Sequence, residues 1–150
     1  MTATRARLAL LAALIPLAAA CGDSSTAPDD PELVARVVAV VPTSGVQSPV
    51  ALAEVELENV GGRPLWLPRC GEATWHALER REGVRWTVVA TTDVCIAVLP
   101  MYPVSLAPGE TRTTLVSIPA DGRYRVEARY GHSAAEPYER GARTPEFIVE

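Results

Sequence analysis

Turns rich in glycine, proline and asparagine interrupt residues 33–150 about every ten residues, and the stretches between them alternate apolar and polar side chains. The alternation is clearest in residues 50–60, where Ala53, Val55 and Leu57 are each followed by a glutamate. Such alternation is typical of half-buried strands, and these loops are too short for the crossover helices that join parallel strands. The sequence therefore predicts an all-β fold, an antiparallel sandwich of seven to nine strands.

Residues 123–130 repeat this pattern near the C-terminus. Because side chains alternate across a strand, we expect the arginines of this segment to point outward and its apolar and aromatic residues inward. The outward set is Arg123, Arg125 and Arg129, and the inward set includes Tyr124 and Val126. Two other segments are predicted to lack strands: residues 104–110, which are rich in turn formers, and residues 131–144, a polar stretch expected to be a long loop.

Composition argues against several functional classes. The chain carries 14 basic residues, all of them arginine, and 18 acidic ones, for a net charge of −4. A net acidic chain lacks the positive surface that nucleic-acid binding needs, so we expect no nucleic-acid partner. Three cysteines, two histidines and two methionines show no catalytic or metal-binding pattern. We therefore expect no enzyme activity, no cofactor and no metal site.

The histidines would take part in chemistry only if other groups joined them. A copper centre would need His76, His132, a cysteine and Met101 to converge, but Met101 follows Cys95 with no histidine between them. A catalytic thiol beside His76 would lack an orienting acid. We expect Trp75 to point inward from its strand and the adjacent His76 to be an exposed histidine at the rim of the domain.

The N-terminal segment has the form of a targeting signal. Two arginines precede an apolar run, residues 8–20, which is too short to span a bilayer. The run ends in Leu17-Ala18-Ala19-Ala20-Cys21, which resembles the bacterial lipobox. The resemblance implies that residues 1–20 are a lipoprotein signal peptide and that a lipid on Cys21 anchors the protein in a membrane. Residues 21–32 would then be the lipidated cysteine and a flexible linker.

The residue after Cys21 bears on the location. It is glycine rather than the aspartate that usually retains lipoproteins in the inner membrane, so the resemblance implies an outer-membrane anchor facing the periplasm of a Gram-negative cell. A lipoprotein at the cell surface is the alternative. Cys70 and Cys95 remain once Cys21 is lipidated, and two cysteines in an oxidising compartment are expected to form a disulfide.

Three further motifs carry a second resemblance. They are Leu57-Glu58-Asn59-Val60-Gly61-Gly62, Leu106-Ala107-Pro108-Gly109-Glu110 and Gly122-Arg123-Tyr124-Arg125-Val126. Their order resembles bacterial immunoglobulin-like domains, most closely those of the intracellular proteinase inhibitor type and of many periplasmic lipoproteins. The resemblance implies an immunoglobulin-like sandwich over residues 33–150, and it implies little about function because such sandwiches carry unrelated activities.

Several residues are candidates for binding. The stripe of Arg123, Arg125 and Arg129 suits an acidic partner or lipid phosphates, although it would equally suit a solvated face with ion pairs. Tyr138, Arg140 and Arg143 lie in the predicted long loop, and such loops on rigid sandwiches often carry recognition. One or two of the three tryptophans are expected to fill the core, and a surplus ring would be a binding anchor: these are Trp66, Trp75 and Trp86.

Together these features predict a membrane-anchored periplasmic module that binds another envelope protein and catalyses nothing. Two alternatives remain open at this point. The resemblance suggests a proteinase inhibitor that acts through an exposed loop. The absence of a recognisable site also allows a passive spacer or a small-ligand carrier.

Overall fold

The computed structural model describes residues 31–44, 49–71, 73–92, 102–135 and 138–150. Cys21, Cys95, the predicted signal peptide and most of the predicted linker lie outside these ranges. The described ranges form strands and no helix, so they contain no helix that could cross a membrane.

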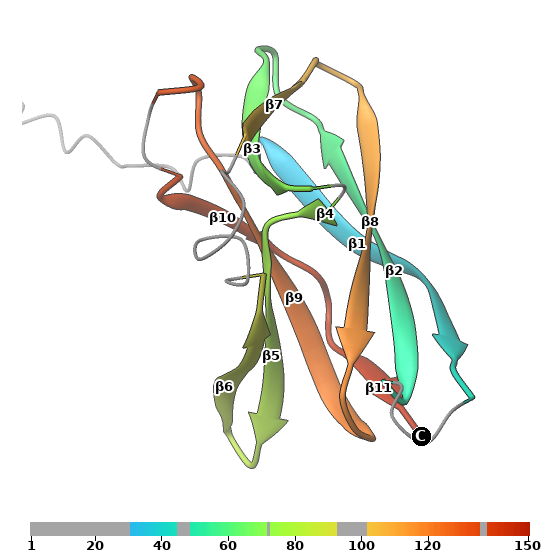
Figure 1. Ribbon diagram of the computed structural model, residues 1–150. Helices are drawn as coiled ribbons and strands as arrows, with labels where there is room; N and C mark the ends of the chain where they lie inside the picture. Colours follow the sequence, from blue (N-terminus) through green and yellow to red (C-terminus); the bar gives the residue numbers. More distant parts are fainter. Residues whose placement is uncertain (1–30, 45–48, 72, 93–101, 136–137) are drawn as a thin grey trace, which may run out of the picture.

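Eleven strands follow one another along the described residues (Figure 1). They are β1 (Leu33–Pro42), β2 (Ala51–Asn59), β3 (Leu65–Cys70), β4 (Ala73–Thr74), β5 (His76–Glu82), β6 (Arg85–Thr91), β7 (Tyr102–Leu106), β8 (Thr111–Ile118), β9 (Gly122–Tyr130), β10 (Arg140–Arg143) and β11 (Phe147–Val149).

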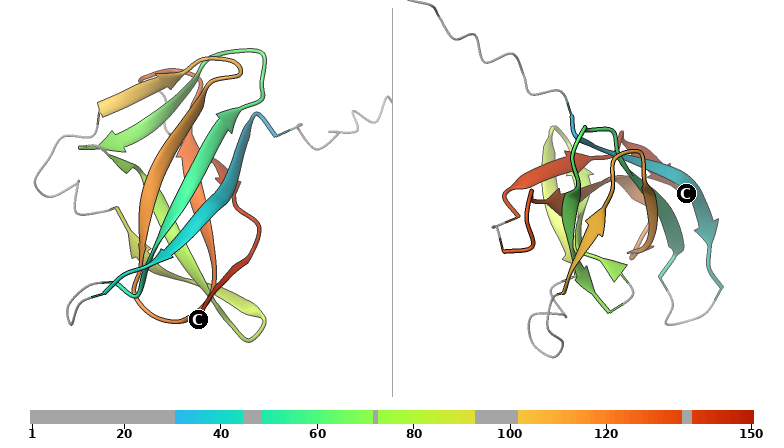
Figure 2. Two further views of the ribbon diagram at one scale, coloured as in Figure 1. Left: turned by 90° about the vertical axis from the view of Figure 1, so that its right-hand side faces the viewer. Right: turned by 90° about the horizontal axis from the view of Figure 1, so that it is seen from above.

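The strands pair antiparallel throughout and form two main sheets and a small one. One main sheet has the order β1-β2-β8, and the other, here called the β9 sheet, has the order β10-β9-β5-β6 with β11 also paired to β9. Figure 2 shows these two sheets facing each other, with the β4-β3-β7 sheet at one end. The predicted all-β antiparallel sandwich is thereby confirmed.

Two segments predicted to lack strands contain them. Tyr102–Leu106 forms β7, which pairs with β3, although residues 104–110 were expected to be a turn. Arg140–Arg143 forms β10 inside the predicted loop 131–144. Both strands are short and contain residues of low strand propensity, Pro103 in β7 and Gly141 and Ala142 in β10, and pairing with a neighbouring strand orders them. These short strands raise the count in the described residues above the predicted seven to nine.

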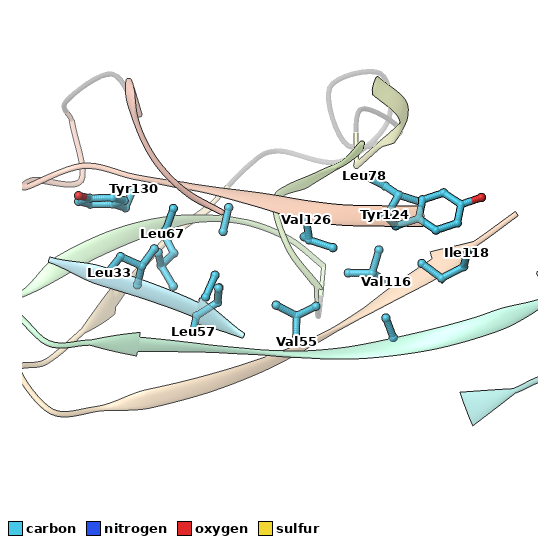
Figure 3. Close-up of a cluster of buried hydrophobic side chains, with 14 of the residues drawn as sticks. Leu33, Val55, Leu57, Leu67, Leu78, Val116, Ile118, Tyr124, Val126 and Tyr130 are labelled. Atoms are coloured by element: carbon cyan, nitrogen blue, oxygen red, sulfur yellow. The ribbon is translucent and has the colours of Figure 1, made fainter. Parts of the chain in front are cut away.

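The core lies between the two main sheets (Figure 3). Ala53, Val55 and Leu57 of β2 are fully buried, as the alternation predicted, and the intervening glutamates are half-exposed. Tyr124 and Val126 of β9 are also fully buried and face them from the opposite sheet. The two-residue periodicity of β2 and β9 therefore generates both walls of the core.

Asn59 is a buried polar residue at the end of β2 that fixes the adjoining turn. Its side-chain amide donates hydrogen bonds to the carbonyls of Arg63 and Leu106, both at 2.8 Å, and its Oδ1 accepts one from the Gly61 N–H at 3.0 Å. A buried amide must satisfy its donors and acceptor within the protein. Asn59 thus joins β2, the turn that follows it and β7.

Replacing Leu57 by alanine tests the importance of this core. Leu57 is fully buried, so Leu57→Ala is expected to lower the free energy of unfolding by about 2–5 kcal/mol through lost burial and a residual cavity. Leu115→Ala on β8 is the matched control, because Leu115 is 59% exposed and its loss is expected to cost below about 1 kcal/mol. Urea unfolding of both variants measures the difference. Equal losses would contradict the assigned core.

Candidate functional site

The outer side of the β9 sheet carries a dense layer of arginine, glutamate and tryptophan. Alternation along β9 and β5 places these residues opposite the core, and cross-strand register aligns Glu79 with Arg125 and Arg81 with Trp86. This layer, called the Arg–Trp face, consists of Arg81, Arg123, Arg125, Arg129, Arg143, Glu79, Glu127, Glu146, Trp75 and Trp86. Five arginines against three glutamates give the surface an excess of positive charge.

Glu79 is the buried anion at the centre of this face. The residue is only 7% exposed, and its carboxylate accepts a hydrogen bond from Nε of Arg125 on the neighbouring strand. Arg143 Nε from β10 lies 3.6 Å from the same carboxylate oxygen. A carboxylate removed from water is costly unless it is paired and hydrogen-bonded, so these two guanidinium groups are held in place by the burial of Glu79.

Glu127 and Glu146 extend the same network. Glu127 accepts a hydrogen bond from Arg143 at 2.7 Å, and Arg129 lies 3.7 Å from its other oxygen. Glu146 accepts from Arg123 at 2.8 Å and from Arg81 at 2.7 Å, and these two bonds hold the pKa of the Glu146 carboxyl below its usual value. Each carboxylate is therefore shared between two cations.

Arginine groups also lie over two tryptophan rings. The guanidinium carbon of Arg125 is 4.3 Å from the ring centroid of Trp86, and that of Arg129 is 5.1 Å from the ring centroid of Trp75. Both distances fall in the range of a cation–π interaction. Each ring therefore holds one guanidinium group in place on the Arg–Trp face.

None of the three tryptophans belongs to the buried core, contrary to the expectation for one or two of them. Trp66, Trp75 and Trp86 are all half-buried. Leucine, valine and tyrosine fill the space between the sheets instead. Two of the rings are consequently available on the Arg–Trp face.

The structure separates the predicted binding residues. Arg123, Arg125 and Arg129 point outward from β9 as predicted, and the structure joins them with arginines from β5 and β10. Arg140 pairs in register with the inward-facing Tyr130, so it starts on the other side of the sheet. Tyr138 is half-buried before β10, and burial raises the pKa of its phenol.

Arg81 and Glu146 had no distinguishing signal in the sequence, and Arg143 was a candidate only as part of the predicted loop. They lie on different strands or in a connecting segment and meet β9 only through sheet pairing. The outward position of Arg81 could have been inferred from its two-residue spacing to Glu79, but its proximity to Glu146 could not. The register between strands is the missing information.

His76 is buried rather than exposed at the rim, which corrects the sequence-based expectation. The residue is 8% exposed, and burial lowers the pKa of its imidazole, while its Nδ1 lies 3.0 Å from the Thr74 carbonyl. His76 pairs with the inward-facing Ala128 and lies two residues before the fully buried Leu78, so it faces inward. Trp75, expected to point inward, instead lies on the outer side beneath Arg129. Among the described residues no three histidine, cysteine or acidic side chains converge to form a metal site.

Cys70 is half-buried at the end of β3. Its proposed partner Cys95 lies outside the described residues, so the disulfide stays a prediction, as does lipidation of Cys21. No protein-family model matches the chain, and no curated protein has a matching sequence. The resemblances to lipoproteins and to proteinase inhibitor-type domains therefore also remain predictions.

A second charged cluster surrounds Glu32 where the chain enters β1. Its carboxylate lies 2.7 Å from Nε2 of His132, 3.1 Å from Nε of Arg63 and 3.4 Å from Nη1 of Arg140. Its backbone carbonyl accepts hydrogen bonds from Val60 and Gly61. The hydrogen bond from His132, followed by that from Arg63, holds the pKa of Glu32 below its usual value of 4.5 despite an opposing effect of burial.

Substituting Glu79 tests whether the buried carboxylate organises the Arg–Trp face. Glu79→Gln keeps the shape but removes the charge that Arg125 and Arg143 share, so we expect a loss of about 1–2 kcal/mol in unfolding free energy. Glu82→Gln, at the exposed end of the same strand, is the control and is expected to change stability by below about 0.5 kcal/mol. Chemical denaturation measures both. An unchanged unfolding free energy in Glu79→Gln would show that the ion pairs of Glu79 do not stabilise the fold.

The lowered pKa of Glu32 predicts a pH-dependent contribution to stability. A carboxyl with a depressed folded-state pKa stabilises the fold above about pH 4.5, and this contribution is lost as the pH falls through the folded-state pKa. Glu32→Gln should therefore be less stable than the wild type at pH 7, and the difference should shrink below pH 4.5. Urea midpoints at pH 7 and pH 3 provide the comparison. A difference that persists unchanged at pH 3 would contradict the electrostatic assignment.

Proposed function

We propose that this chain is a non-enzymatic, lipid-anchored module of the bacterial envelope that binds an acidic surface of another envelope protein. The single observation that carries the proposal is the Arg–Trp face. Arginine and tryptophan are the residues most enriched in the energetically dominant part of protein interfaces. Here both types cover one sheet face without belonging to the core.

The order of the face favours binding over a merely solvated surface. Free arginine side chains lose conformational entropy when a partner immobilises them, which reduces affinity. Arg125 is already held by Glu79 and by the ring of Trp86, and Arg143 by Glu79 and Glu127. Part of the entropy cost has therefore been met on folding, and a carboxylate-rich partner would meet guanidinium groups in fixed positions.

The sign of the charge points to the partner's chemistry. The whole chain has a net charge of −4, whereas the face has two more arginines than glutamates. An acidic partner would be repelled by most of the molecule and attracted to this surface, which favours one orientation of approach. Glu32, the last residue of the predicted linker, is fixed to the domain, so about ten residues after Cys21 would let the domain reach roughly 30–35 Å from its anchor.

Cross-linking in cells tests the proposal. The full chain is tagged, a photo-reactive residue is placed at exposed Val88 on β6, and captured proteins are identified by mass spectrometry. We expect one dominant envelope protein with an acidic surface. Trp86→Ala should weaken its affinity about 30-fold, which corresponds to the 2 kcal/mol typical of a dominant interface residue.

Arg85→Ala is the matched control, because Arg85 is exposed and adjacent to Trp86 but lies on the opposite side of β6. It should leave capture unchanged. Cys21→Ser separates anchoring from binding: it should release the protein from membranes while the purified pair still associates. Equal capture of the partner by the wild type and by Trp86→Ala would contradict binding through the Arg–Trp face. Capture of a protease that the chain inhibits would instead support the inhibitor alternative.

A further inference from the structure

A groove lies between the first residues of β1 and strand β10, on the side of the sandwich where the two main sheets end. Its volume is about 650 Å³. The nearly buried Ala35, Tyr130 and Ala142 contribute apolar lining, and the exposed Arg140 and Arg143 of β10 contribute positive charge. Arg36 of β1 also lines the groove, but two glutamates of β2 neutralise it. Figure 2 shows the beginning of β1 beside the C-terminal segment of the chain in the view from above.

Both strands that line the groove have a free edge. Among the described residues β1 pairs only with β2, and β10 pairs only with β9. A strand at the edge of a sheet presents unpaired N–H and C=O groups that an additional extended segment can use. Of these strands, β10 has the regular edge: its pairing with β9 shows no register shift, whereas β1 carries a bulge between Val37 and Ala39 and bulges disturb strand addition.

The charges around the groove select the chemistry of such a segment. Among the described lining residues Glu32 is the one carboxylate, and it is shared by two arginines, Arg63 and Arg140, and contacted by the His132 ring. Arg143 lines the other end of the groove. The two carboxylates that it contacts, those of Glu79 and Glu127, are each also paired with another arginine. Positive charge is therefore in excess at both ends of β10, and an acidic segment would relieve it.

We propose that an extended acidic segment of the partner protein adds to the free edge of β10 in this groove. A strand paired with β10 would alternate its side chains between two environments. Those level with Ala142 would turn toward the apolar lining, and those level with Gly141 and Arg143 would turn toward the Arg–Trp face. The expected segment therefore alternates small apolar residues with aspartate or glutamate over about four residues, the length of β10.

This inference deepens the proposed function and rests on it, because Arg143 belongs both to the groove and to the Arg–Trp face. Gly141, between the groove residues Arg140 and Ala142, also touches the Arg–Trp face, because a Cβ on this residue would lie 2.8 Å from Oε1 of Glu127. A partner that covers the face could thus continue along β10 without leaving the surface. The face would supply side-chain contacts, and the groove would supply main-chain hydrogen bonds.

A peptide with blocked ends and eight alternating valine and glutamate residues serves as the probe. It is titrated into the full mature chain in detergent micelles, with peptide fluorescence anisotropy and backbone amide shifts as readouts. We expect saturable binding with shift changes concentrated in residues 31–36 and 140–143. The double variant Arg140→Gln, Arg143→Gln should weaken binding at least tenfold, and a peptide with lysine in place of glutamate should not bind.

Arg85→Gln is the control for a change of charge outside the groove and should leave peptide binding unchanged. Amide spectra of the double variant establish that it remains folded. Peptide binding that is absent, or mapped away from β1 and β10, would overturn the groove inference. If capture of a partner in cells still depended on Trp86, the proposed function would stand without the groove inference. If the peptide bound in the groove but capture of a partner in cells did not depend on Trp86, the groove inference would stand and the proposed function of the Arg–Trp face would be wrong.

Discussion

The pairing of β9 with its three neighbours fixes the position of almost every residue discussed above. Its inward side chains, Tyr124, Val126 and Ala128, form one wall of the core, and its outward side chains form the middle of the Arg–Trp face. Because side chains alternate strictly along a strand, these two roles cannot be changed independently. A shift of one residue in register would bury arginines and expose the core. The apolar packing of one side thus determines the geometry of the charged side.

The Arg–Trp face shows how burial can order charged groups. Exposed ion pairs contribute little to stability, because water and salt screen them and long side chains lose entropy. Glu79 differs in being almost completely buried, which makes the loss of its partners costly. The Trp86 ring on the other side of Arg125 narrows the choice of rotamers further. The cost of burying one carboxylate is offset by arginines that stay in fixed positions at the surface.

The sequence predicts the strands that carry their own alternation and misses what depends on their neighbours. The inward and outward sets of β2 and β9 follow from spacing alone, and so does the outward position of the β9 arginines. The orientation of His76 does not, because the large apolar residues Trp75 and Leu78 fall on opposite sides of the strand and spacing alone does not show which side faces the core. The strand β10 is equally hidden, since Arg-Gly-Ala-Arg has little strand propensity and is ordered by pairing with β9. Cross-strand partners such as Arg143 and Glu127 require the register, which a single sequence does not encode in any local pattern.

The proposed anchor and the two proposed surfaces make different demands on the partner. A lipid on Cys21 would confine the domain to a thin layer next to a membrane, which raises the local concentration of any partner in the same layer. Under these conditions a modest affinity is sufficient, and selectivity becomes the harder requirement. Arginines held on a sheet face select for acidic surfaces in general, whereas a free strand edge selects for an extended segment with two-residue alternation. A partner that satisfies both requirements would be distinguished from the many acidic proteins that satisfy only the first.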